Sequence, residues 1–244
     1  RVHDDHRLPP NAGMLHGYDA TSGASPLRLR TFDALRERLA GDERRLWDLL
    51  GVGHVVTWRR ELPGATRILD DGEGEAYAAL FARDATRPPV WRVGRAERVT
   101  SDAAALERLA DPAFDPFGTV LLHEGDPASR GASAASAQVL SLAPGDVEVV
   151  TEGALPGWLV VSEMAYPAWR ATIDGAPAPV LRADVALMAV AVPPGRHIVR
   201  LRVAPGRVTT GLAASLASAL VLTAVAVRGA RGARSAGRAA TIGA

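Results

Sequence analysis

The pattern of hydrophobic and polar residues predicts two amphipathic helices in the first half of the chain. In the first, Thr31–Leu50, Thr31 can cap the N-terminus, and the pair Gly41 and Asp42 predicts a break that divides the helix in two. The second, Ser101–Ala110, begins with its own capping serine and carries an acid in its first turn. Each helix is expected to turn an apolar face toward a core. On the first helix this face carries Phe32, Leu35, Leu39, Leu46, Leu49 and Leu50.

Short apolar runs rich in β-branched residues predict strands around these helices. The predicted strands are Val52–Trp58, Ala65–Leu69, Ala76–Arg83, Val90–Val93, Ala96–Thr100 and Gly118–His123. Residues 1–30 are rich in Pro, Gly and Asn, which predicts an irregular entry segment. Residues 125–137 are rich in Gly, Ser and Ala, which predicts a flexible connector. Residues 1–137 are therefore interpreted as an N-terminal mixed α/β region.

After Ser136 the pattern changes to short strands separated by frequent turns. The turns are marked by Pro144-Gly145, Asp174-Gly175 and Pro194-Gly195. Strands at this spacing are typical of an antiparallel β-sandwich, here jelly-roll-like, over residues 138–206, so the predicted fold class is α+β. The predicted strands are Gln138–Leu142, Val147–Glu152, Trp158–Glu163, Trp169–Ile173, Val180–Arg182, Ala186–Val192 and His197–Val203.

An uncharged apolar run lies near the C-terminus. The run Val208–Val227 contains no charged residue, and at 1.5 Å per residue it reaches about 30 Å, the thickness of the hydrocarbon core of a bilayer. Four arginines and no acid follow it, which favours a transmembrane helix over residues 207–228 and a basic cytoplasmic tail over residues 229–244. The alternative is a buried helix of a soluble domain, because the run is rich in Ala and contains Ser and Thr.

Small residues four positions apart lie within this run. Gly211, Ser215 and Ala219 fall on one helical face, and small residues at this spacing allow another membrane helix to approach closely. The run is therefore expected to pack among other helices. Because no signal peptide precedes the external region, we expect the chain to be the C-terminal piece of a longer protein whose earlier membrane spans export it.

Composition narrows the function classes only slightly. The formal net charge is +1, which gives no bulk electrostatic basis for binding nucleic acid. The chain has no cysteine, so disulfides and Cys-ligated metals are excluded. The sequence also lacks a phosphate-binding P-loop and the nucleophile-elbow motif of α/β-hydrolases.

The C-terminal half carries a recognisable series of residues. An aromatic run leads into an Asp-Gly turn, then a Val-Pro-x-Gly-x-His element, a final strand and a proline before the apolar run. The residues are Tyr166, Trp169, Arg170, Ala171, Asp174, Gly175, Val192, Pro193, Gly195, His197 and Pro205. This series resembles the end of bacterial YfhO-like membrane proteins. Asn11, Met14, the Gly17–Asp19 run and the Leu49–Val56 run resemble earlier elements of the same family.

The resemblance implies a function for the parent protein. The family is polytopic and resembles GT-C glycosyltransferases, which transfer sugar from a polyprenyl-phosphate donor to a cell-envelope acceptor. By this resemblance the chain is the last extracytoplasmic region and last span of a protein in the bacterial cell membrane. Its expected partners are the bilayer, the upstream helices of the parent, and the lipid-linked sugar and envelope glycan. The catalytic carboxylate of such enzymes lies in an early loop, so we expect no catalytic residue here.

Two groups of residues are candidate contacts for sugar. Aromatic rings pack on the CH groups of sugars, and charged side chains bind hydroxyl groups. The first group is Tyr166, Trp169, Arg170 and Asp174, with Trp158 nearby in the sequence, and the alternative is that these are core and turn residues. The second group is His16, Tyr18 and Asp19, interpreted as a surface that faces the membrane core of the parent.

No metal site or cofactor is predicted in the chain, although the parent could hold a divalent metal. The run His3-Asp4-Asp5-His6 matches no established ligand spacing, and the run from Asp70 to Glu75 lacks the length of an EF-hand loop.

The alternative to a part of a glycosyltransferase is a non-catalytic, membrane-tethered β-sandwich with a carbohydrate-binding or structural role.

Overall fold

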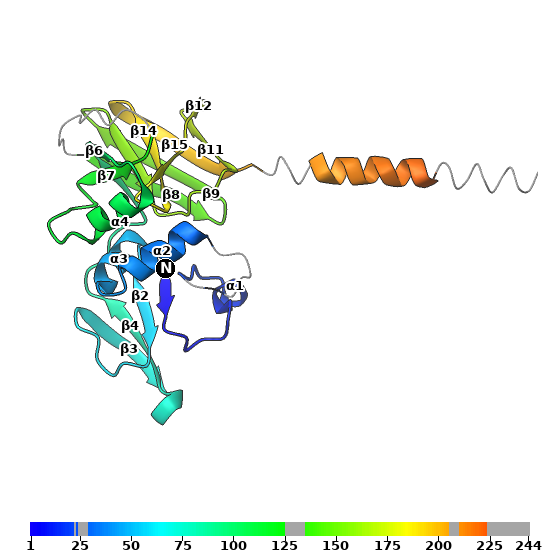
Figure 1. The fold of residues 1–244 in the computed structure, drawn as a ribbon. Helices are drawn as coiled ribbons and strands as arrows, with labels where there is room; N and C mark the ends of the chain where they lie inside the picture. The colour runs from blue at the N-terminus through cyan, green and yellow to red at the C-terminus, as the bar shows by residue number, and fades with distance from the viewer. Residues whose placement is uncertain (22, 24–28, 125–134, 205–209, 224–244) are drawn as a thin grey trace, which may run out of the picture. The chain divides into compact units, whose positions relative to one another are not determined.

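The computed structural model describes residues 1–21, 23, 29–124, 135–204 and 210–223. The chain divides into two compact units, Arg1–Arg202 and Val203–Ala244. The first unit is a mixed α and β structure in which strands predominate, arranged in three sheets (Figure 1).

The helices form where the apolar pattern predicts them, but the first begins at Arg30, so Thr31 lies inside it and the prediction that Thr31 caps it is wrong. The first predicted helix is divided into α2 (Arg30–Arg38) and α3 (Glu43–Leu49), and the Asp42 side chain accepts a hydrogen bond from the Arg45 backbone amide at the start of α3. The break at Gly41 and Asp42 is therefore confirmed. Helix α4 (Asp102–Ala110) begins after Ser101, whose hydroxyl accepts a hydrogen bond of 3.1 Å from the Ala104 amide.

A four-stranded sheet is formed by the first third of the chain. Its order is β1-β2-β4-β3, with β1 (Val2–Asp4) parallel to β2 (His54–Thr57) and the other pairs antiparallel. Strand β4 (Ala78–Arg83) lies inside the sheet and β3 (Ala65–Asp71) at its edge. A single 3₁₀ turn, η1 (Gly74–Ala76), stands between β3 and β4.

The six-stranded sheet combines strands from both halves of the sequence. Its order is β5-β10-β14-β13-β7-β6. The predicted boundary between residues 137 and 138 therefore does not separate two folding units, because strands from either side of it pair within one sheet. The strands are β5 (Val90–Val93), β6 (Arg95–Arg98), β7 (Thr119–Leu122), β10 (Gly157–Val161), β13 (Leu181–Ala183) and β14 (Leu187–Val192).

The third sheet has five strands in the order β12-β11-β15-β9-β8, and its β12–β11, β15–β9 and β9–β8 pairs are antiparallel. Strand β8 begins at Ala135, so the last three residues of the predicted connector belong to a strand, while residues 125–134 lie outside the described residues. The strands are β8 (Ala135–Ala143), β9 (Asp146–Gly153), β11 (Trp169–Ile173), β12 (Ala176–Ala178) and β15 (Gly195–Val203).

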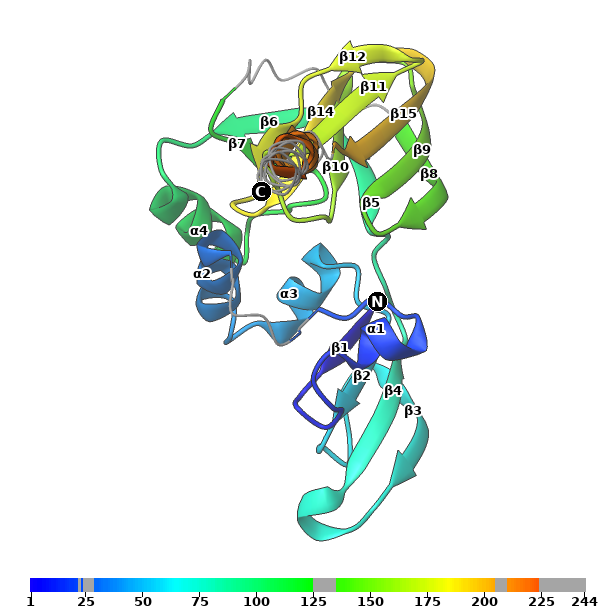
Figure 2. The same cartoon turned by 90° about the vertical axis from the view of Figure 1, so that its right-hand side faces the viewer.

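The six-stranded sheet is buried on both faces, with a separate core on each. In β10, Leu159 and Val161 point into a core shared with the five-stranded sheet, whereas Trp158 and Val160 point into a core shared with the helices and the four-stranded sheet. Side chains alternate between the faces of a strand, so an uninterrupted apolar run fits a sheet covered on both sides. Figures 1 and 2 show α3 between the six-stranded and four-stranded sheets.

The entry segment contains more regular structure than its composition predicts. Besides β1, it forms the short helix α1 (Ala12–His16), which ends at Gly17 in the left-handed conformation. Gly13 is required inside this helix, because a Cβ there would lie 2.5 Å from the carbonyl oxygen of Tyr18. The expectation of an irregular segment over residues 1–30 is therefore wrong for these two elements; of the rest, residues 22 and 24–28 lie outside the described residues.

In the second unit, the described residues 210–223 form a helix whose side chains are exposed. Positions 207–209 and 224–228 of the predicted span, and the tail 229–244, lie outside the described residues. Within the part of the chain that is described, no helix combines the length and apolar character needed to cross a membrane.

Candidate functional site

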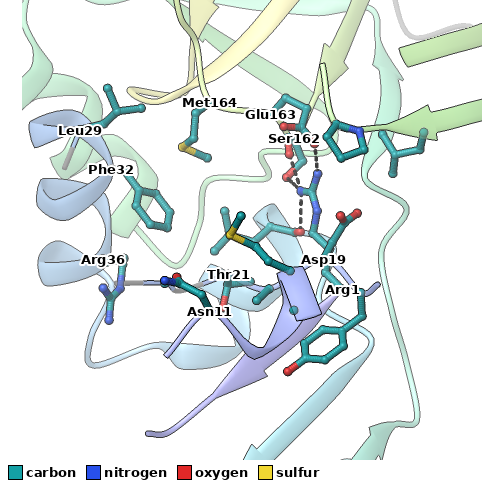
Figure 3. A pocket seen from close by; sticks show the side chains of 18 of the residues that line it. Arg1, Asn11, Asp19, Thr21, Leu29, Phe32, Arg36, Ser162, Glu163 and Met164 are labelled. Atoms are coloured by element: carbon teal, nitrogen blue, oxygen red, sulfur yellow. Dashed lines mark hydrogen bonds and ion pairs between the residues drawn. The ribbon is translucent and has the colours of Figure 1, made fainter. Parts of the chain in front are cut away.

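A cleft with a volume of about 1150 Å³ lies in the first unit. Its walls come from the N-terminal segment, the start of α2, the turn between β8 and β9, and the residues that follow β10. Figure 3 shows Asn11 and Thr21 across the cleft from Leu29 and Phe32, with Met164 beside the latter pair. Polar and apolar groups therefore share the same cavity, as in many small-molecule sites.

Arg1 connects two walls of this cleft. Its guanidinium donates hydrogen bonds to the Leu50 carbonyl at 3.0 Å, to the Ser162 hydroxyl at 2.9 Å and to the Ser162 carbonyl, and it forms an ion pair with Glu163 (Figure 3). The Ser162 hydroxyl in turn donates to the Leu49 carbonyl at 2.7 Å. These contacts fasten the N-terminal segment and the end of α3 to the residues after β10.

Burial changes the electrostatics of this wall. The pKa of Glu163 is raised by burial, and the neighbouring Arg1 guanidinium opposes part of the increase. Because Arg1 is already occupied by one carboxylate and three oxygen acceptors, it is a structural cation of the cleft wall. A ligand in the cleft would therefore contact other lining side chains rather than Arg1.

Two of the three residues predicted near the N-terminus line the cleft. Tyr18 and Asp19 are among its lining residues, whereas His16, at the end of α1, is exposed and is not among them. The backbone explains the placement: the Tyr18 amide donates to the Gly13 carbonyl at 3.1 Å, and the Val2 amide donates to the Asp19 carbonyl at 2.8 Å. The chain therefore turns back after α1 and runs beside β1.

The second predicted group is not assembled into one surface. Trp169 is 7% exposed and lies in the core between the five- and six-stranded sheets, while Trp158 is equally buried in the core on the opposite face of the six-stranded sheet. Tyr166 is 57% exposed, and the Arg170 guanidinium donates to the Pro167 and Trp169 carbonyls. The expected aromatic platform is therefore wrong: the group consists of core and surface residues, and the two tryptophans lie in separate cores on opposite faces of the six-stranded sheet.

Asp174, the fourth residue of this group, stabilises a turn. It has a φ of 51° between β11 and β12, and its carboxylate contacts the His197 Nδ1 at 2.6 Å and accepts the Ile198 amide at 2.8 Å. The hydrogen bond from His197 lowers the pKa of Asp174, and the same bond raises the pKa of His197. Asp174 thus holds the turn against β15.

The acidic and histidine-containing runs have partners within the fold. His3 contacts Thr21 and Asp5, and Asp4 accepts the backbone amides of Arg7 and Leu8. Within the described ranges, no group of three or more His, Asp or Glu side chains is placed to hold a metal ion.

The cleft also contains residues that the sequence pattern does not single out. Ser162, Glu163 and Met164 follow a buried strand, and Arg1 lies about 160 positions away in the sequence. No periodicity or motif links positions so far apart, so only the pairing of the strands brings them together.

Comparisons with protein-family models, with curated proteins and with solved structures gave no match. The function is therefore inferred from the residues and their contacts.

Proposed function

We propose that the chain is the C-terminal extracytoplasmic part of a polytopic YfhO-like protein of the GT-C glycosyltransferase type. The parent would transfer sugar from a polyprenyl-phosphate donor to a cell-envelope acceptor. The proposal rests on the residue series from Tyr166 to Pro205 and on the cleft. In this assignment the fragment holds the acceptor glycan, and the catalytic residue belongs to another part of the parent.

The groups that line the cleft support the sugar-binding part of this proposal. Tyr18 offers an aromatic ring, and Asn11, Asp19 and Thr21 offer polar groups around the same volume. Sugars present apolar CH faces and hydroxyl groups together, so they suit cavities that combine an aromatic ring with carboxylate, amide and hydroxyl groups. The volume of about 1150 Å³ leaves space for more than one sugar unit.

The proposal includes a β-sandwich and a membrane helix. The sandwich would consist of the five- and six-stranded sheets, which share one apolar core. Residues 207–228 would cross the bilayer with residues 1–206 outside, supported by the uncharged run and the arginines after it. Gly211, Ser215 and Ala219 would face the upstream helices of the parent.

The alternative is a structural or carbohydrate-binding sandwich without catalysis in the parent, and one observation limits where it would contact sugar. Trp158 and Trp169 are used inside the cores, so the sheets themselves expose no aromatic platform around these residues. In this alternative the sheets support the cleft and the cleft alone contacts sugar.

Titration calorimetry of the full chain in a mild detergent tests the proposal. Neutral envelope sugars, such as N-acetylglucosamine and its disaccharides, should bind with a Kd of about 1 mM, and Tyr18→Ala or Asp19→Ala should weaken binding about tenfold. His16→Ala is the matched control, because His16 lies on the same segment but is not among the residues that line the cleft.

Two results would count against the proposal. The first is the absence of heat with all neutral sugars, or equal binding by the cleft variants and the wild type. The second concerns the membrane part: recovery of the expressed chain entirely in the detergent-free soluble fraction would exclude the span over residues 207–228.

A further inference from the structure

A second pocket, separate from the cleft, lies where α3 meets two loops. It has a volume of about 620 Å³ and is enclosed by α3, the turn between β2 and β3, and the loop between β4 and β5. Its lining residues, all of them in the first unit, differ from those of the cleft. Three of them are arginines: Arg44, Arg83 and Arg87.

The acids of this pocket are already engaged by donors of the fold. Asp48 forms an ion pair of 2.7 Å with Arg83, whose side chain also donates to the Val52 carbonyl. Asp84 accepts a hydrogen bond of 2.9 Å from the Thr66 hydroxyl. Arg83 and Asp48 are therefore paired with each other, whereas Asp84 is held by Thr66 and its carboxylate stays exposed.

The other two arginines have no carboxylate partner among the described residues. Arg44 donates to the Pro63 carbonyl at 2.6 Å, and the guanidinium of Arg87 lies 4.7 Å from the centre of the Phe117 ring. Gly64, with a φ of 72°, keeps the space beside Arg44 open, since a Cβ there would lie 3.2 Å from its Nη2. A guanidinium carries five N–H donors, so both side chains retain donors for a ligand.

Trp47 contributes a third feature to the pocket wall. Its ring lies 5.6 Å from the Arg83 guanidinium carbon, and its indole N–H is buried without a hydrogen-bond partner among the described residues. Because Trp47 lines the pocket, its indole N–H signal can report on a charge bound there.

We propose that this pocket binds a small oxyanion, a carboxylate or phosphate group carried on a polar molecule. Arg44 and Arg87 supply the positive charge, and guanidinium groups bind both kinds of oxyanion through paired hydrogen bonds. The site goes beyond the proposed function, because it requires neither the resemblance to YfhO-like proteins nor the sugar cleft. It adds charge recognition to a fragment whose larger cavity suits neutral sugars.

The indole N–H signals of the full chain in detergent, observed by ¹H–¹⁵N NMR, provide the test. Trp47→Phe identifies the signal of Trp47 among the five tryptophans. Inorganic phosphate, glucuronate and neutral glucose are then titrated separately to about 50 mM. The Trp47 signal should move with at least one of the anions and remain in place with glucose, and the anion that acts at lower concentration distinguishes phosphate from carboxylate.

Variants link the response to the pocket. Arg44→Ala and Arg87→Ala should each weaken the anion response about tenfold. Arg95→Ala is the matched control, because Arg95 is an exposed arginine of β6 that does not line this pocket. An unmoved Trp47 signal with both anions, or an equal response in the wild type and in both pocket variants, would overturn the proposal. Neither result depends on whether neutral sugars bind the cleft.

Discussion

At the residue scale, Asp184 is the least expected feature of the molecule. It lies in the turn between β13 and β14 with a φ of 46°, and it is completely buried. One carboxyl oxygen accepts the Leu121 amide at 2.9 Å, while the other has no hydrogen-bond partner among the described residues. Burial raises the pKa of Asp184 from 3.8 to about 7, and the bond from Leu121 opposes the increase.

This pKa predicts how stability depends on pH. The folded carboxyl keeps its proton up to about pH 7, whereas the unfolded carboxyl loses it near pH 3.8. The folded state therefore holds more protons in this range, and the free energy of unfolding falls as the pH rises through it. The loss approaches roughly 4 kcal/mol, since one pKa unit corresponds to about 1.4 kcal/mol.

Asp184→Asn should remove most of this dependence. The amide keeps an oxygen for the Leu121 N–H and cannot ionise, so the variant should match the wild type at low pH and exceed its stability near neutrality. Urea unfolding followed by circular dichroism at several pH values measures this. Parallel pH profiles for the two proteins would refute the assignment of the titration to Asp184.

At the element scale, the six-stranded sheet depends on close packing of β10 against β5. A Cβ at Gly157 would lie 2.7 Å from the Val93 carbonyl oxygen and 3.2 Å from the Arg92 Nε. Arg92 is itself buried, donates to the Leu155 and Pro193 carbonyls, and has its pKa lowered by desolvation. Glycine is thus required here because the backbone and a buried guanidinium occupy the space of a side chain.

Gly157→Ala should destabilise the protein by about 1–3 kcal/mol, because either β10 or the Val93 backbone must shift. Gly41→Ala is the matched control, since its Cβ would meet no atom within 4 Å, and its effect should stay within about 0.5 kcal/mol. Chemical denaturation of both variants provides the comparison. Equal stability of Gly157→Ala and the wild type would show that this contact relaxes freely.

At the scale of the whole molecule, the two halves of the first unit fold as one. The pairs β5–β10 and β7–β13 join residues before 124 to residues after 156. Arg1 adds hydrogen bonds to Ser162. A fragment that begins at residue 138 would expose the paired edges of β10 and β13 and the apolar face that carries Trp158 and Val160.

The fragment of residues 138–206 should therefore show no cooperative thermal transition, whereas the fragment of residues 1–206 should melt in a single step. Thermal melts followed by circular dichroism distinguish these outcomes, with the longer fragment as the control. A cooperative transition in the shorter fragment would mean that the five-stranded sheet is stable without the N-terminal strands.

The sequence by itself determined the local structure. Ser101 marked a helix start because its side chain caps the backbone immediately after it, and Gly41 with Asp42 marked a break between two helices. Short apolar runs marked strands such as β5 and β14, because the pattern of a strand is set by its neighbours in sequence. Tyr18 and Asp19, by contrast, were singled out only by the resemblance of the Gly17–Asp19 run to an element of YfhO-like proteins.

Only the tertiary structure decided which strands pair and which side chains meet. The apolar pattern of β10 is the same whether Trp158 faces one core or the other, so the core that Trp158 enters could not be predicted from it. The cleft likewise combines distant segments, such as those of Arg1 and Ser162. The second pocket does so with the segments of Arg44 and Arg87. Such contacts depend on long-range pairing between strands, for which a single sequence contains no local signal.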